Sequence, residues 1–166
     1  MKEKIVDRWT LRERIGTLKA AGKKIVFTNG CFDILHVGHV RYLREARSFG
    51  DLLIVAVNSD TSVRTIKGEK RPLLPEAERA ELVASLECVN FVTVFPEPTP
   101  LAVIELVRPD ILVKGGDWRE EDVIGREEVL SWGGRVKLIP MTKGASTTNI
   151  IENILKVYRE HIGGSE

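Results

Sequence analysis

The chain has 166 residues, of which 43% are hydrophobic and 30% are charged, as in a globular domain that buries its own core. Its 25 basic and 24 acidic residues nearly balance, so net charge gives no reason to expect nucleic acid or an anionic membrane as a partner. Two cysteines make no disulfide framework, and no apolar run reaches the roughly 18 residues of a membrane span. The N-terminus is too charged for a signal peptide, so we expect a cytoplasmic protein.

Short apolar runs alternate along the chain with segments of helical periodicity. The runs predict buried strands at 25–27, 52–57, 91–95, 111–113 and 136–139. The helical segments are 11–21, a segment starting near 38, 76–86, 101–107, 126–132 and 146–161. This alternation predicts an α/β fold, a single Rossmann-like, doubly wound sheet of five parallel strands. We expect residues 1–22 to form an N-terminal helix packed on a domain over 23–162, followed by a loose tail at 163–166.

Ligands of doubly wound folds bind at the carboxyl ends of the strands. Polar or glycine-containing segments follow four of the predicted strands, at 28–39, 58–71, 114–118 and 142–148. Because parallel strands end at the same edge of the sheet, we expect these four segments to meet at one site.

The first of these segments carries His36 and His39, which are three residues apart at a predicted helix start and can face the same side. Gly38 lies between them and leaves space for a phosphate, and a helix N-terminus adds free N–H groups and a partial positive charge. This pattern predicts a local anion site. Two other interpretations remain open: a helix-capping pair, or a zinc site completed by Asp33 or Cys31. The segment is neither a dinucleotide-binding G-x-G-x-x-G nor a P-loop.

The stretch Gly30-x-Phe32-Asp33-x-x-His36-x-Gly38-His39 resembles the signature of the cytidylyltransferase-like nucleotidyltransferase superfamily. Ser146-Thr147-Thr148 is similar to the second signature of that family, and Lys114-Gly115-Gly116-Asp117 to its ribose-binding loop. The resemblance implies catalytic roles for His36, His39, Lys67 and Thr148. It implies nucleotide binding by Asn29, Gly30, Cys31, Phe32, Gly38, Gly116, Asp117, Ser146 and Thr147, and acceptor binding by Asp33, Asn58 and Arg71.

Four stretches, 27–33, 57–60, 112–118 and 146–151, resemble the heptose-phosphate adenylyltransferases in particular. Met141 stands where the glycerol-phosphate cytidylyltransferases carry an arginine. The resemblance therefore implies transfer of AMP from ATP to heptose 1-phosphate, which yields pyrophosphate and ADP-heptose, the donor for lipopolysaccharide cores. It also implies Mg²⁺ bound mainly through the nucleotide, with no metal held by side chains, and a homodimer. The alternatives are cytidylyl transfer to glycerol 3-phosphate and a non-catalytic nucleotide sensor on the same fold.

Overall fold

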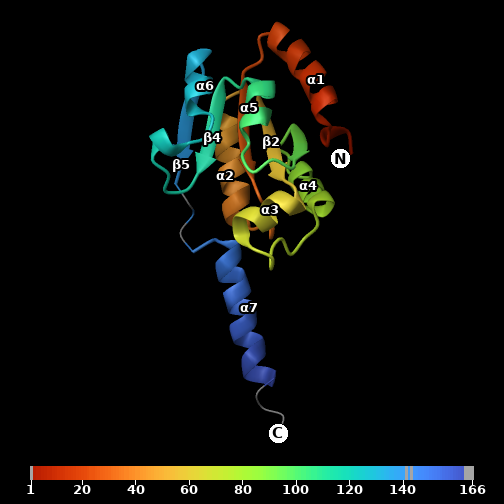
Figure 1. Ribbon diagram of the computed structural model, residues 1–166, viewed down its shortest axis with the longest axis vertical. Coiled ribbons are helices and arrows are strands. Elements are labelled where there is room, and N and C mark those ends of the chain that lie inside the picture. Colours follow the sequence, from red (N-terminus) through yellow and green to blue (C-terminus); the bar gives the residue numbers. More distant parts are fainter. Residues whose placement is uncertain (1, 141, 143, 163–166) are drawn as a thin grey trace.

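The computed structural model describes residues 2–140, 142 and 144–162 of the chain. Within them, five strands form one sheet: β1 (Ile25–Gly30), β2 (Leu52–Asn58), β3 (Phe91–Phe95), β4 (Ile111–Gly115) and β5 (Arg135–Ile139). Their order is β3-β2-β1-β4-β5, and every neighbouring pair is parallel. The expected Rossmann-like sheet is confirmed (Figure 1).

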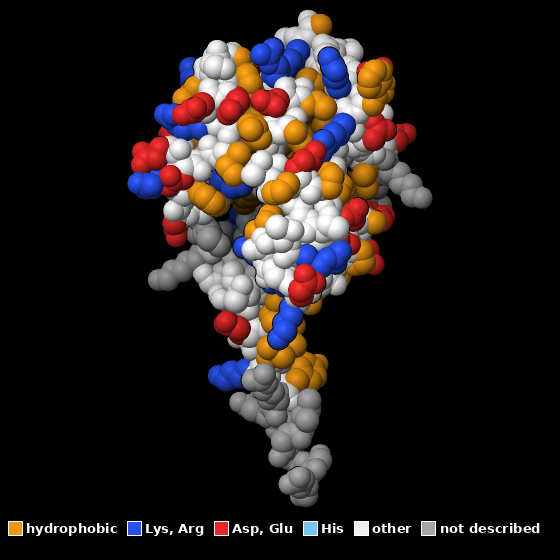
Figure 2. Space-filling view, in the orientation of Figure 1, with side chains coloured by type: hydrophobic (Ala, Val, Ile, Leu, Met, Phe, Trp, Pro, Cys, Tyr) orange, Lys and Arg blue, Asp and Glu red, His pale blue; other side chains and the backbone are white. Residues whose placement is uncertain are grey.

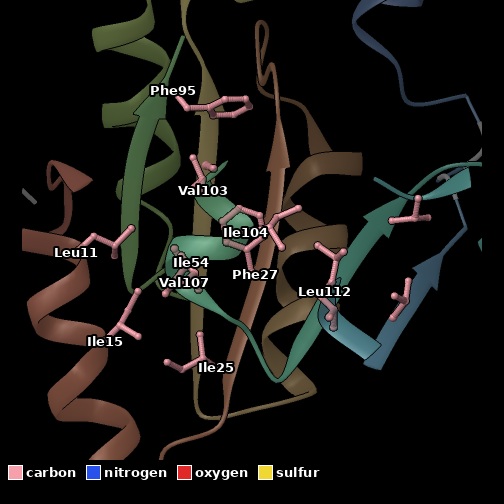
Figure 3. Close-up of a cluster of buried hydrophobic side chains, with 14 of the residues drawn as sticks. Leu11, Ile15, Ile25, Phe27, Ile54, Phe95, Val103, Ile104, Val107 and Leu112 are labelled. Carbon is pink, nitrogen blue, oxygen red and sulfur yellow. The ribbon is translucent and has the colours of Figure 1, made fainter. Parts of the chain in front are cut away.

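Helices connect the strands and cover both faces of the sheet. They are α1 (Arg8–Ala20), α2 (Val37–Ser48), α3 (Asp60–Lys67), α4 (Glu76–Ala84), α5 (Leu101–Val107), α6 (Arg126–Ser131) and α7 (Thr147–Ile162), with short 3-10 turns η1 (Lys2–Lys4) and η2 (Glu120–Asp122). Apolar side chains of α1 and α5 pack on one face, among them Leu11 and Ile104, against Phe27, Ile54 and Leu112 of the strands (Figure 3). On the other face, α2 and α4 contribute a second cluster that includes Leu43 and Val83.

The chain order of the strands reverses beside β1. After β1 the chain builds outward through β2 and β3, then returns to the other side of β1 to form β4 and β5. The crossover helices leave in opposite directions there, which opens a crevice at the carboxyl ends of β1 and β4. The loop after β1 and the last residues of β4 border this crevice.

The structure differs from the sequence-based expectation most clearly at 58–71, a segment for which we predicted no helix. Residues Asp60–Lys67 form helix α3 instead. The β-branched residues of this segment, which include its threonines, have weak helix propensity. The helix forms nevertheless, because the Ser59 side chain caps it by accepting a hydrogen bond from the N–H of Ser62 at 3.1 Å. The polar cap, rather than the composition of the segment, fixes where the helix begins.

Helix α7 projects away from the rest of the domain (Figure 1). Figure 2 shows hydrophobic side chains along this helix and a mixture of acidic and basic side chains over the visible face of the domain. Ile154, Leu155, Val157 and Tyr158 of α7 are all exposed. No helix among the described residues is long and apolar enough to cross a membrane. Met141 and the expected tail at 163–166 lie outside the described residues.

Candidate active site

A cleft of about 440 Å³ opens at the carboxyl edge of the sheet. Its walls come from the loop after β1, the start of α2, the ends of β4 and β5, and the start of α7, with Lys67 and Arg71 added from the segment after β2. Each of the four segments expected at this edge contributes residues to the walls. Three of the expected site residues in these segments do not line the cleft and are described below. Of the expected site residues, those that line the cleft are Asn29, Gly30, Cys31, Phe32, Asp33, His36, Gly38, His39, Lys67, Arg71, Ser146, Thr147 and Thr148.

The two imidazoles at the start of α2 are stacked against one another. The ring centroids of His36 and His39 are 3.9 Å apart, and the ring planes differ by 27°. His36 is the N-cap of α2, and its Nδ1 accepts a hydrogen bond from the N–H of Gly38 at 3.1 Å. In a neutral ring the proton then lies on Nε2, which is the donor that His36 offers to a ligand. Capping and ligand binding thus use different nitrogens of this imidazole.

Both rings are neutral near pH 7. Burial, together with the smaller effect of the neighbouring His36, lowers the pKa of His39 from 6.5 to about 4. Burial also lowers the pKa of His36. Nδ1 of His39 is buried and has no hydrogen-bond partner among the described residues. Two stacked imidazolium ions would repel each other, so the pair favours the uncharged form until an anion binds beside it.

Gly38 is required by the His36 ring. A Cβ at this position would lie 2.9 Å from Cε1 and Nδ1 of His36 and 3.1 Å from the Cβ of Ala145. The sequence suggested that this glycine leaves room for a phosphate, whereas the structure shows it leaving room for the imidazole and for the loop before α7.

Two buried charges clamp the first loop to the segment after α3. Asp33, 2% exposed, pairs with Arg71 and accepts the N–H groups of Leu73 and Leu74 at 2.8 and 3.0 Å. Arg79, which is fully buried, donates from Nε to the carbonyl of Leu74 at 2.9 Å and from Nη1 to the carbonyl of Cys31. Its remaining nitrogen, Nη2, donates to Oδ1 of Asp60 at 2.8 Å. The peptide groups of Leu74 are therefore held from both sides.

Arg79 was not among the predicted site residues, although its position in the sequence indicates a buried arginine. It occupies the apolar face of α4 that also carries Ala80 and Val83, where an unpaired charge would be costly. An arginine on a buried helix face requires buried oxygen partners, and here one of them is the backbone of the first loop.

The N-terminus of α7 lines the same cleft as the two histidines. Oγ of Ser146 accepts the N–H of Asn149 at 3.0 Å, which caps the helix, and Oγ1 of Thr147 donates to the carbonyl of Ile34 at 3.3 Å. The second bond ties α7 to the loop that carries His36. Two helix N-termini, those of α2 and α7, thus border one cleft. This arrangement favours the binding of a polyanion.

Three expected residues do not line the cleft. The side chain of Asn58 is buried and donates to Oγ of Ser62 at 2.9 Å, so it fixes the β2–α3 turn. Gly116 lies just beyond the cleft-lining end of β4 and donates its N–H to the carbonyl of Ile139 at 3.0 Å. The neighbouring Asp117 is exposed. Their expected roles in binding stay predictions.

The part of the chain that the structure describes offers no ligand set for the zinc alternative. The described residues contain no group of three or more His, Cys, Asp and Glu side chains that could hold a metal ion. Asp33 is engaged by Arg71 and two backbone N–H groups, and burial raises the pKa of the Cys31 thiol, which disfavours the thiolate that would bind a metal.

Comparison with known proteins decides the family. A family model described as cytidylyltransferase-like matches residues 27–153, which include the whole cleft. The chain belongs to the cytidylyltransferase-like family. It is therefore a nucleotidyltransferase, and the stacked histidines lie in the part of the chain that the family shares.

Relatives of this nucleotidyltransferase include the bifunctional protein HldE of Geobacter sulfurreducens, 60% identical over 146 residues that make up 88% of this chain and 30% of the relative. HldE of Pelobacter propionicus is 56% identical over 155 residues, 93% of this chain and 32% of the relative. The chain thus spans less than a third of the length of these curated relatives.

Among solved structures, a lipopolysaccharide core biosynthesis protein from Thermoplasma volcanium is 31% identical to this nucleotidyltransferase, with a TM-score of 0.62. The match covers 75% of this chain and all of the other. Pantoate-beta-alanine ligase from Francisella tularensis shares the fold alone, at 15% identity and a TM-score of 0.60, over 93% of this chain and 77% of the ligase.

Proposed function

We propose that this chain transfers AMP from ATP to heptose 1-phosphate and releases pyrophosphate. The observation that carries the proposal is the stacked pair His36 and His39, which lines one cleft together with the N-terminus of α7 at the carboxyl edge of the sheet. Neutral imidazole donors and helix N-termini suit a triphosphate, because they stabilise developing charge without a large net charge on the protein.

In the proposed reaction, an oxygen of the sugar's phosphate attacks the α-phosphorus of ATP. A new phosphorus–oxygen bond forms as the bond from that phosphorus to the bridging oxygen breaks, and pyrophosphate leaves with the bonding electrons. A phosphate monoester is already anionic near pH 7, so the attack needs no general base. His36 and His39 donate hydrogen bonds to phosphate oxygens, and Ser146, Thr147 and Thr148 bring the first turn of α7 against them.

Two basic residues of the cleft, Lys67 and Arg71, complete this proposal. Lys67 ends α3 just before Gly68, whose φ of +89° lets the chain turn away from the helix. Lys67 is exposed, so it is free to turn toward a bound phosphate, whereas Arg71 is held by Asp33. We assign to Lys67 the stabilisation of the leaving pyrophosphate and to the Asp33–Arg71 pair the placement of the acceptor.

We propose that Mg²⁺ takes part in this reaction bound to ATP. The described side chains offer no cluster that could hold such an ion by themselves. We therefore propose that the ion arrives coordinated by nucleotide oxygens and water, as Mg²⁺ commonly does in phosphoryl-transfer enzymes.

The choice of ATP and heptose rests on the sequence resemblance. The stretches at 27–33, 57–60, 112–118 and 146–151 resemble heptose-phosphate adenylyltransferases, and Met141 takes the place of the arginine of glycerol-phosphate cytidylyltransferases. A lipopolysaccharide core biosynthesis protein among the structural neighbours supports a sugar phosphate as the acceptor.

The deciding experiment offers ATP or CTP together with heptose 1-phosphate or glycerol 3-phosphate, and measures pyrophosphate and the nucleotide product. We expect ADP-heptose and pyrophosphate in equal amounts from ATP and heptose 1-phosphate. Faster turnover of CTP with glycerol 3-phosphate would replace the proposal with the cytidylyl alternative. Nucleotide binding without turnover of any pair would favour the sensor.

We also propose that the chain forms a homodimer. The exposed apolar side chains Ile154, Leu155, Val157 and Tyr158 on α7 support it, because burying them against a second copy would be favourable. Sedimentation equilibrium should give twice the chain mass for the wild type and a lower association constant for Leu155→Asp. A monomer at all concentrations would contradict the dimer without affecting the catalytic proposal.

A further inference from the structure

Lys114 is a cation of the cleft to which the sequence assigned no individual role, although it begins the stretch that resembles the ribose-binding loop. It is the penultimate residue of β4, the neighbour of β1, so it lies at the crevice where the strand order reverses. Its Nζ donates a hydrogen bond to Oδ1 of Asn29, near the end of β1, at 3.2 Å. The same Nζ lies 5.6 Å from the centroid of the Trp118 ring.

The surroundings of this ammonium group differ from those of the neighbouring arginines. Arg71 is paired with Asp33, and Arg79 with Asp60. Among the residues that the structure describes, no carboxylate forms a salt bridge with Lys114. Burial accordingly lowers the pKa of Lys114, because the charged form has left water without gaining a counter-ion.

A half-buried ammonium with no carboxylate partner is incomplete on its own. It has three N–H donors, of which the amide oxygen of Asn29 takes one, and the face of Trp118 offers only weak electrostatic support. The partner that would complete this ammonium group is an anion, and Lys114 lines the cleft in which one could bind.

We propose that Lys114 binds a phosphate oxygen of a substrate, with Asn29 and Trp118 holding the ammonium in place for it. Two substrates could supply that oxygen under the proposed function, the triphosphate of the nucleotide and the monoester phosphate of the acceptor. The chemistry is the same in both cases, a charge-assisted hydrogen bond that compensates a buried cation. The inference depends on the proposed function only for the identity of the acceptor.

Calorimetric binding tests the proposal without requiring turnover. The variants are Lys114→Met, Lys114→Arg and the matched control Lys137→Met, an exposed strand lysine on β5 outside the cleft. The probes are MgATP, pyrophosphate and heptose 1-phosphate. We expect Lys114→Met to weaken at least one probe by about 10-fold to 100-fold, the range for a hydrogen bond to a charged group, while Lys114→Arg regains part of the loss and Lys137→Met binds as the wild type.

The pattern of losses identifies the source of the phosphate. Weaker MgATP and pyrophosphate binding would assign Lys114 to the nucleotide, and weaker heptose 1-phosphate binding alone would assign it to the acceptor. Wild-type affinity of Lys114→Met for all three probes would overturn the inference. If heptose 1-phosphate binds neither the wild type nor the variants, the acceptor proposal fails, and the MgATP and pyrophosphate arms still decide the role of Lys114.

A second measurement covers the case in which Lys114→Met does not fold. The wild-type protein is treated with an amine-reactive reagent, and modification of each lysine is followed by peptide mass analysis with and without MgATP, pyrophosphate or heptose 1-phosphate. We expect at least one of these probes to slow modification of Lys114 several-fold and to leave Lys137 unchanged. Equal rates for Lys114 with and without every probe would overturn the inference.

Discussion

The substitution Gly38→Ala tests whether the cleft depends on the position of the His36 ring. In α2 an alanine is intrinsically a better helix residue than glycine, so propensity alone predicts a protein at least as stable as the wild type. The new Cβ would lie 2.9 Å from two atoms of the His36 ring, whereas ordinary contacts begin at 3.4 Å. The ring must therefore move by about half an ångström, and Ala145 on the other side restricts where it can go.

This displacement sets the size of the expected effect. A misplacement of about 1 Å in a catalytic site costs on the order of 10²-fold in rate, so half that displacement should cost about tenfold. We expect kcat of Gly38→Ala to fall about tenfold, with little change in the thermal midpoint. The effect should appear in kcat more than in KM, because the helix N-termini that attract the triphosphate are unchanged.

The matched control is Gly16→Ala. Gly16 lies in the middle of α1, where a Cβ would meet nothing within 4 Å. This variant should gain about 0.5–1 kcal/mol of stability and keep full activity. Steady-state kinetics and thermal denaturation of both variants measure the predicted changes in kcat and in stability. Wild-type kcat in Gly38→Ala would refute the argument that His36 must occupy its observed position.

Three further predictions concern buried charges and the histidine pair. His36→Ala should lower kcat by on the order of 10²-fold in a pyrophosphate-release assay, as expected for loss of a donor to developing charge; turnover near that of the wild type would exclude this role. Because the pKa of His39 is lowered from 6.5 to about 4 in the folded protein, the unfolded chain binds protons more readily between these values, and stability is lost as pH falls through this window. Urea denaturation of His39→Gln should show a shallower loss between pH 7 and pH 5, and slopes equal to the wild type would contradict the shifted pKa. Arg79→Met should lower the free energy of unfolding by roughly 3–5 kcal/mol, because it leaves buried oxygens without donors. The control Arg64→Met, at an exposed position, should lower it by less than about 0.5 kcal/mol. Equal denaturation midpoints for the two variants would exclude the proposed clamp.

Strands β1, β2 and β4 were predictable because most of their residues are buried on both faces of the sheet. Runs such as 52–57 are continuously apolar, and Leu53 to Val57 are indeed fully buried in β2. Helix α3 was not predictable from periodicity, since its eight residues are mostly polar or β-branched and its start depends on one capping hydroxyl. Local sequence specifies strongly apolar elements better than short capped ones.

The cleft was partly predictable for a related reason. Parallel strands place their following loops at one edge, so His36 and Ser146 could be expected together although they are far apart in sequence. The pairing of Lys114 with Asn29 and the hold of Arg79 on the first loop depend on side-chain positions across the fold, which no local pattern specifies. Asn58 failed to reach the cleft because α3 begins only two residues later and engages its side chain.

The most direct measurement is a long-range ¹H–¹⁵N spectrum of the three histidine side chains during titration with MgATP. We expect the ring nitrogens of His36 and His39 to shift together as the nucleotide binds, with Nε2 protonated in both rings. Saturable nucleotide binding that leaves His36 and His39 unshifted would contradict the claim that this imidazole pair receives the triphosphate.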